Sequence, residues 1–155
     1  MEMKQKTLFT IGYEDVTVEA LVRKLGAAGV SVLIDVRAVP LSRKPGLSKN
    51  RLAERLAQSG IEYLGLKGLG TPAAGRDAAR RGRIAEMRAI FKRHMASAEA
   101  QEDLKRAIET ATKKSCCLLC FEHAPSQCHR MIVADIMAEE AGMKIEHLDP
   151  LAPLA

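Results

Sequence analysis

The residue types best suited to chemistry lie close together between Cys120 and Arg130. Cys120 follows an apolar run, and Cys128, His129 and Arg130 are consecutive at the start of a predicted helix. The N-terminus of a helix has unpaired N–H groups and a partial positive charge, so it attracts anions. A thiol at such a position, beside a histidine and an arginine, ionises more easily than free cysteine. We therefore predict a reactive thiol in this stretch.

Three kinds of chemistry fit these residues. In the first, the thiolate of Cys120 or Cys128 is a nucleophile, and His129 or Asp35 moves protons. In the second, Cys120 and Cys128 form a dithiol pair across one loop. In the third, both cysteines bind a metal ion together with His123 and His129, although the spacing is not a standard zinc pattern. No cofactor is predicted, and simple packing roles for both cysteines stay open.

A second charged cluster, Asp35 and Arg37, ends another apolar run. A charge at the end of such a strand must be paired, or solvated in a cleft. We expect Asp35 to orient Arg37 or Arg130, or to accept a substrate proton; the alternative is a structural ion pair that joins two loops. The residues predicted to bind an anionic substrate are Arg37, Arg130, Arg43, Tyr13 and Glu122.

The elements that must position these residues alternate between strands and helices. Hydrophobic patterns predict strands over 7–11, 30–36, 61–66, 115–120 and 144–148, and a loop over 67–72. Helices are predicted after the capping residues Thr17 and Ser48, along stripes over 84–95 and 104–111, and over 131–141. This order predicts an α/β fold.

The predicted architecture is a single domain over 1–149 with a C-terminal tail over 150–155, and 155 residues suit one domain. Its mostly parallel five-stranded sheet carries helices on both faces. In such sheets, ligands bind beyond the carboxyl ends of the strands, where the candidate residues fall.

The positive charge of the chain is local. Net charge is +5, and the segment 76–93 holds seven basic residues against Asp77 and Glu86, so it alone accounts for this value. Such a segment suits an anionic small molecule or nucleic acid as a partner, and the simpler alternative is a solvated helix face. Neither a membrane-length apolar run nor the apolar centre of a signal peptide is present, so we expect no membrane partner, a cytoplasmic location and reduced thiols.

Short motifs along most of the chain are similar to one known family. They are TIGY at 10–13, LIDVR at 33–37, SRKPG at 42–46, YLGL at 63–66, LGTP at 69–72, and LC at 119–120 with CHR at 128–130. Together they resemble the bacterial family catalogued as domain of unknown function 488. Because the activity of that family is not established, the resemblance implies a fold and a site position rather than a reaction.

A more distant likeness is to the sites of rhodaneses and low-molecular-weight phosphatases. Those sites place an Asp-Val-Arg strand near a strand, a cysteine loop and a helix that begins with arginine. By this likeness, Cys120 stands where their nucleophile would be, and Arg130 where their anion-binding arginine would be. The loop here is longer, lacks their glycines and contains a second cysteine.

Three functions therefore stay open at the level of sequence. The first is an enzyme that uses a thiol on an anionic or nucleotide-like substrate bound in a cleft at the strand ends. The second is a nucleic-acid-binding module that uses the basic segment 76–93. The third is a structural scaffold without catalysis, in which the polar cluster only holds loops together. The sequence gives no indication of the oligomeric state.

Overall fold

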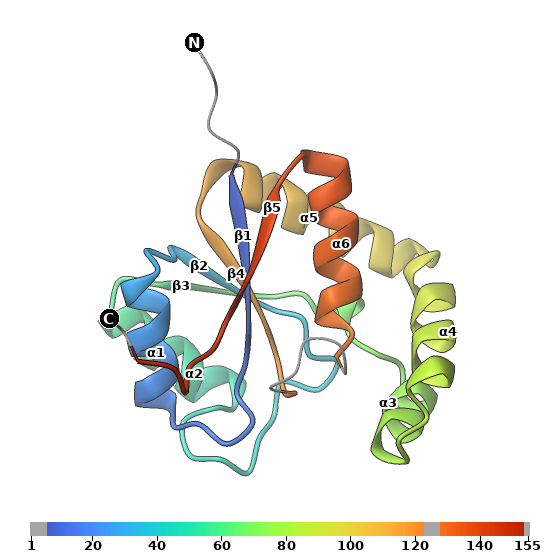
Figure 1. Ribbon diagram of the computed structural model, residues 1–155, viewed down its shortest axis with the longest axis horizontal. Helices are drawn as coiled ribbons and strands as arrows, with labels where there is room; N and C mark the ends of the chain where they lie inside the picture. The colour runs from blue at the N-terminus through green and yellow to red at the C-terminus, as the bar shows by residue number, and fades with distance from the viewer. Residues whose placement is uncertain (1–5, 123–127, 154–155) are drawn as a thin grey trace.

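Five parallel strands form one sheet with helices on both of its faces (Figure 1). This computed structural model describes residues 6–122 and 128–153. The strand order is β3-β2-β4-β1-β5. The strands are β1 (Thr7–Gly12), β2 (Val32–Asp35), β3 (Glu62–Gly65), β4 (Cys116–Cys120) and β5 (Lys144–Leu148). The predicted α/β class and five-stranded parallel sheet are confirmed.

In the part of the chain that the structure describes, six α-helices surround the sheet. They are α1 (Val18–Ala27), α2 (Lys49–Gln58), α3 (Ala73–Arg80), α4 (Ile84–Met95), α5 (Ala98–Lys113) and α6 (Arg130–Ala141). A short 3-10 helix, η1 (Lys67–Leu69), lies in the predicted loop 67–72. In Figure 1, α1 and α2 lie on one side of the sheet, α5 and α6 on the other, and α3 and α4 beyond one end. None of the described helices is long and apolar enough to cross a membrane.

The core has two parts, one on each face of the sheet. The first cluster joins the sheet to α4, α5 and α6 through residues such as Phe91, Leu104 and Met137, and the second joins it to α1 and α2. Because successive side chains of a strand point to opposite faces, β4 contributes to both clusters. Cys120 belongs to the first cluster and Cys117 to the second. The cysteines of β4 therefore have different surroundings although they are close in sequence.

Two local details differ from the sequence-based prediction. Helix α3 was not predicted, because it buries only Gly75 and Ala78 and so has a very narrow apolar stripe. Ser48 precedes α2 as expected, but its hydroxyl does not cap that helix. It instead accepts from the backbone N–H of Ser42 and donates to the Ser42 carbonyl. The predicted cap of α1 is confirmed, since Thr17 Oγ1 accepts from the N–H of Ala20 at 3.1 Å.

Candidate active site

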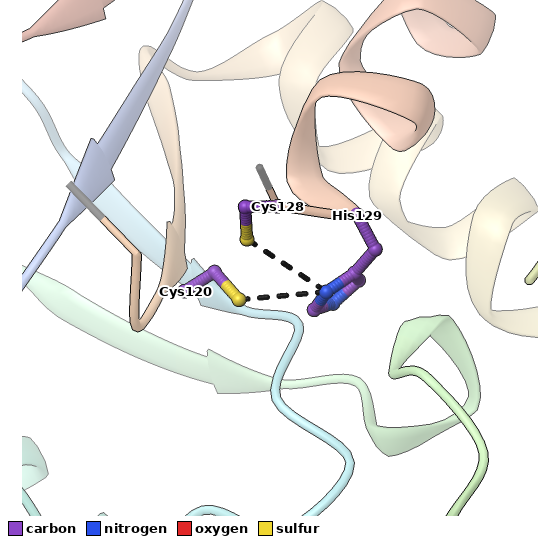
Figure 2. A group of neighbouring side chains, drawn as sticks. All are labelled: Cys120, Cys128 and His129. Carbon is purple, nitrogen blue, oxygen red and sulfur yellow. Dashed lines mark hydrogen bonds between the residues drawn. The ribbon is translucent and has the colours of Figure 1, made fainter. Parts of the chain in front are cut away.

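Two thiols and one imidazole meet beyond the carboxyl end of β4 (Figure 2). Cys120 is the last residue of β4, and Cys128 and His129 directly precede α6. The Nδ1 atom of His129 lies 3.4 Å from Cys120 Sγ and 3.8 Å from Cys128 Sγ. All three residues are buried, with at most 6% of each exposed. The fold thus brings together three residues that the sequence singled out.

The backbone just after β2 fixes the orientation of the His129 ring. Its Nε2 atom lies 2.8 Å from the carbonyl oxygen of Val36, which can only accept a hydrogen bond. Nε2 therefore carries a proton and donates a hydrogen bond to the Val36 carbonyl. In the neutral ring, the lone pair of Nδ1 then faces both thiols; in the charged ring, Nδ1 donates to a thiolate. The ring also contacts Phe91, with 5.1 Å between centroids.

The two thiols differ in their tendency to ionise. Burial alone raises the pKa of Cys128, but the hydrogen bond from Cys120 and the charges of His129 and Arg130 outweigh burial and hold this pKa well below the usual range. Burial, together with the hydrogen bond to Cys128 and its negative charge, raises the pKa of Cys120 well above that range. The pKa of His129 is lowered by burial but raised overall by the Cys128 thiolate. The arrangement favours a thiolate at Cys128 paired with an imidazolium.

A cavity of about 470 Å³ opens above this group. This volume lies within the usual range for small-molecule sites. Cys120, Cys128 and His129 form part of its wall, and Tyr13 and Phe121 contribute an edge-to-face aromatic pair with 5.3 Å between ring centroids. The remaining lining residues are Glu14, Arg37, Ala38, Val39, Thr71, Arg76, Ala79, Arg80, Met87 and Glu122. The cavity can therefore admit a small molecule directly to both thiols.

Asp35 holds Arg37 in place at the end of β2. The Arg37 guanidinium donates to both carboxylate oxygens of Asp35, at 2.8 and 2.7 Å, and to the carbonyl of Leu47 at 2.8 Å. The hydroxyl of Tyr63 donates to the same carboxylate at 2.6 Å. Asp35 is 1% exposed and does not line the large cavity, whereas Arg37 does. The structure thus places Asp35 behind Arg37, as its orienting partner.

Two arginines predicted to bind a substrate anion do not line the cavity. Arg130 is fully buried, and its Nη1 donates to the carbonyl of Glu122 at 2.5 Å. Its charge acts on Cys128 through space and lowers the pKa of that thiol. Arg43 is exposed in the loop between β2 and α2. Neither side chain is among the residues that surround the large cavity.

Glu122 and Tyr13 do line the cavity, as the sequence led us to expect. Glu122 Oε2 lies 3.8 Å from Cys120 Sγ, within hydrogen-bond reach of that thiol. Burial and the negative charge of Cys128 raise the pKa of Glu122 to about 7. Tyr13 packs over Arg37, whose guanidinium carbon lies 5.2 Å from the ring centroid. Glu122 is thus a carboxyl group that can exchange a proton near neutral pH.

The sequence did not identify Arg76, Arg80 and Thr71 as site residues. Arg76 and Arg80 lie on α3, and Thr71 lies just before it. They were missed because α3 was not predicted, so nothing indicated that this segment turns back toward the strand ends. The cluster of positive charge over 76–93 was the available signal. Two of its arginines reach the cavity wall.

The same thiol and imidazole atoms could hold a metal ion. The donor atoms of Cys120, Cys128 and His129 all lie within 4.8 Å of one another. Two sulfur ligands and one nitrogen ligand suit a soft divalent ion such as zinc. His123, the fourth residue of the predicted metal set, lies outside the described residues.

Comparison with known proteins identifies a family that matches most of the chain. The family described as "Domain of unknown function DUF488" matches residues 17–137. No curated protein and no solved structure matches the chain. The distant likeness to rhodaneses and low-molecular-weight phosphatases is therefore not shown. The matched range includes β2, β4, both cavity cysteines and most of α6. Because this range covers most of the chain, the protein belongs to the DUF488 family.

Proposed function

We propose that the protein is a thiol-dependent enzyme that acts on a small anionic substrate, with Cys128 as its nucleophile. The observation that carries the proposal is that Cys128 shares an imidazole with Cys120 in the wall of a cavity that also has arginines. A buried thiolate that had only a packing role would be costly. Held by His129, and open to a substrate-sized space, the same group is suited to nucleophilic attack.

The substrate anion would lie toward α3. Arg76 and Arg80 line that side of the cavity, and Arg37 lines the side toward β2. Arg37 is held in a buried ion pair with Asp35, whereas the pair of Arg80 with Asp77 is exposed and weak, so the arginines of α3 supply most of the attraction for an added negative charge. Tyr13 and Phe121 offer ring surface for an apolar or nucleobase portion of the substrate. A phosphorylated compound of nucleotide size would place its phosphate near the arginines and its ring near the aromatic pair.

The reaction would be a substitution at the electrophilic atom of the substrate. Cys128 Sγ donates an electron pair to that atom, while the bond to the leaving group breaks and its electrons depart with the leaving group. Protonated Glu122, which lines the same cavity, gives the leaving group its proton. Water then attacks the covalent intermediate, returns a proton to Glu122 and releases the thiolate. His129 keeps Cys128 ionised at both stages.

Alkylation by iodoacetamide at pH 7 in the presence of a chelator tests this proposal. Peptide mapping should show that Cys128 reacts at least tenfold faster than Cys116 and Cys117, which serve as internal references in β4. Inorganic phosphate should slow the reaction at Cys128. Equal, slow alkylation of all these thiols would overturn the proposal.

Matched arginine variants test where the anion binds. Arg76→Gln and Arg80→Gln should weaken protection by phosphate, because they remove charge from the cavity wall. Arg93→Gln removes the same charge from an exposed position outside that wall and should leave protection unchanged. Equal effects of all three substitutions would argue against an anion site in the cavity.

Binding of nucleic acid through the segment 76–93 stays a prediction. Several of its charges are engaged within the segment: Arg80 and Arg81 pair with Asp77, and Arg83 pairs with Glu86. Aromatic residues make up only 3% of the chain, so stacking of bases on a series of rings has little support. These features favour a small anion in the cavity over a nucleic-acid strand as the partner.

A further inference from the structure

The presence of a second thiol in the cavity needs its own explanation. Nucleophilic attack by Cys128 requires one thiolate and one imidazole, yet Cys120 Sγ is closer to His129 Nδ1, at 3.4 Å against 3.8 Å. The sulfur atoms and the ring nitrogen all lie within 4.8 Å of one another. A disulfide requires a sulfur–sulfur distance of about 2.0 Å. The two sulfur atoms lie within 4.8 Å of each other, so they must approach by about 2.8 Å at most to form that bond.

The surroundings give the two thiols different parts in such a reaction. Cys128 lies just before α6, 3.8 Å from His129 Nδ1, and the start of a helix beside a histidine favours a thiolate, so Cys128 is the attacking thiol. Cys120 ends β4 and keeps its proton. His129 Nδ1 lies 3.4 Å from its Sγ and can receive that proton once the ring has given up its own Nδ1 proton, and Glu122 Oε2 lies at 3.8 Å. An attacking thiolate beside a protonated second thiol with a base in reach is the arrangement of a reactive and a resolving cysteine.

The other cysteines of β4 lack these features. Cys116 Sγ contacts the carbonyl of Lys114 at 3.5 Å, and Cys117 Sγ contacts that of Leu118 at 3.7 Å. Neither lines the large cavity, and burial raises the pKa of both thiols. Among the described cysteines, only Cys120 and Cys128 share a cavity that a small oxidant can enter.

We propose that Cys120 and Cys128 form a peroxide-driven disulfide site, in which Cys128 is oxidised first and Cys120 resolves the product. The proposal rests on the proposed function in one respect, the nucleophilic character of Cys128. It adds a second reaction at the same site. The disulfide form has no thiolate at Cys128, so oxidation would switch off the proposed substitution reaction until a dithiol reductant restores the thiolate.

The reaction balances with hydrogen peroxide as the oxidant. The Cys128 thiolate attacks one peroxide oxygen, the O–O bond breaks, and the departing hydroxide takes the Nδ1 proton of His129 to become water, which leaves the ring neutral. Cys128 has then lost two electrons and is a sulfenic acid. Cys120 Sγ attacks that sulfur, the S–O bond breaks, and the proton of Cys120 passes through His129 Nδ1 to the departing hydroxide. One peroxide and two thiols thus give one disulfide and two waters.

The test is peroxide treatment of the reduced full-length protein, followed by intact-mass measurement and peptide mapping. We expect the loss of two hydrogen masses and a crosslinked peptide that joins Cys120 to Cys128. A dithiol should reverse both changes. Cys120→Ser should form no disulfide and should instead accumulate sulfenic acid at Cys128, which dimedone traps. Cys116→Ser, a matched change in the same strand, should form the disulfide as the wild type does.

Two outcomes would overturn the disulfide site. One is accumulation of sulfenic or sulfinic acid at Cys128 in the wild type while Cys120 stays reduced. The other is the same product in the wild type and in Cys120→Ser. Both can occur while Cys128 is still alkylated rapidly and protected by phosphate, in which case the proposed function stands. Slow alkylation of Cys128 together with a normal disulfide would overturn the proposed function and leave the disulfide site standing.

Discussion

The buried charge of the Asp35 side chain is stabilised by the side chains that donate hydrogen bonds to it. Its carboxylate accepts hydrogen bonds from Arg37 and from the hydroxyl of Tyr63 while almost fully buried. A buried charge whose partner is removed destabilises a protein far more than the pair stabilises it. The Asp35–Arg37 pair is therefore best understood as a unit that keeps one guanidinium at a fixed place in the cavity wall.

Substitutions of Asp35 and of Tyr63, which donates a hydrogen bond to it, should differ sharply in their effect on stability. Asp35→Asn leaves the Arg37 charge buried without its counter-ion and should lower the free energy of unfolding by about 3–5 kcal/mol. Tyr63→Phe removes one hydrogen bond to the carboxylate and should cost about 1–2 kcal/mol. Urea unfolding of both variants measures these values. Similar small losses in both would show that Arg37 finds another partner when Asp35 is changed.

The ends of β1 and β4 approach each other closely at Gly12. A Cβ atom added to Gly12 would overlap the carbonyl of Glu122 and lie 3.1 Å from Nη1 of Arg130. The Glu122 carbonyl is the group that receives the Arg130 hydrogen bond. Because Gly12 at the end of β1 has no side chain, there is room for the hydrogen bond between Glu122, just after β4, and Arg130, at the start of α6.

Two glycine substitutions test this packing of elements. Gly12→Ala should lower the free energy of unfolding by about 1–3 kcal/mol, because the added methyl group displaces the backbone at Glu122. Gly26→Ala lies within α1 with open space around the added atom, so it should raise stability by up to about 1 kcal/mol. Thermal and urea unfolding of the pair give opposite signs if the argument holds. Loss of stability in both variants would point to a general intolerance of alanine.

For the molecule as a whole, the site introduces a dependence of stability on pH. The pKa of Glu122 in the folded state is about 7, raised from an ordinary value of 4.5. A raised carboxyl pKa means that the folded state binds the proton more tightly than the unfolded state. The associated stability is fully present below pH 4.5 and is lost as the pH rises through 7. The charged or titratable groups that face Glu122 are Cys120, Cys128 and His129.

Removal of this carboxyl group should therefore raise the stability of the folded protein at high pH only. Glu122→Gln should match the wild type near pH 4.5 and exceed it in free energy of unfolding at pH 8. Urea unfolding at a series of pH values measures the difference. Glu54→Gln, at an exposed position on α2, is the control and should show no such trend. A constant difference between Glu122→Gln and the wild type would contradict the assigned proton affinity.

The sequence predicted much of this architecture, and the reasons for its failures are physical. Long apolar or periodic segments identified all five strands, and the placement of their carboxyl ends brought Cys120, Cys128, His129 and Arg37 correctly to one edge. Helix α3 has too few buried residues to produce a pattern. The burial of Arg130 could not be predicted, because it depends on the missing side chain of Gly12, more than a hundred residues away.

The strand order β3-β2-β4-β1-β5 also has a consequence for how the protein is made. The site draws Tyr13 from just after β1, Val36 from just after β2, one thiol from the end of β4 and the other from the segment just before α6. Contacts between such distant parts of a chain form late, because the intervening loops must first be closed. A chain that is still leaving the ribosome therefore holds ordinary cysteines. The surroundings that lower the pKa of Cys128 form only when the last helix docks, so a thiol-reactive probe would report completed folding.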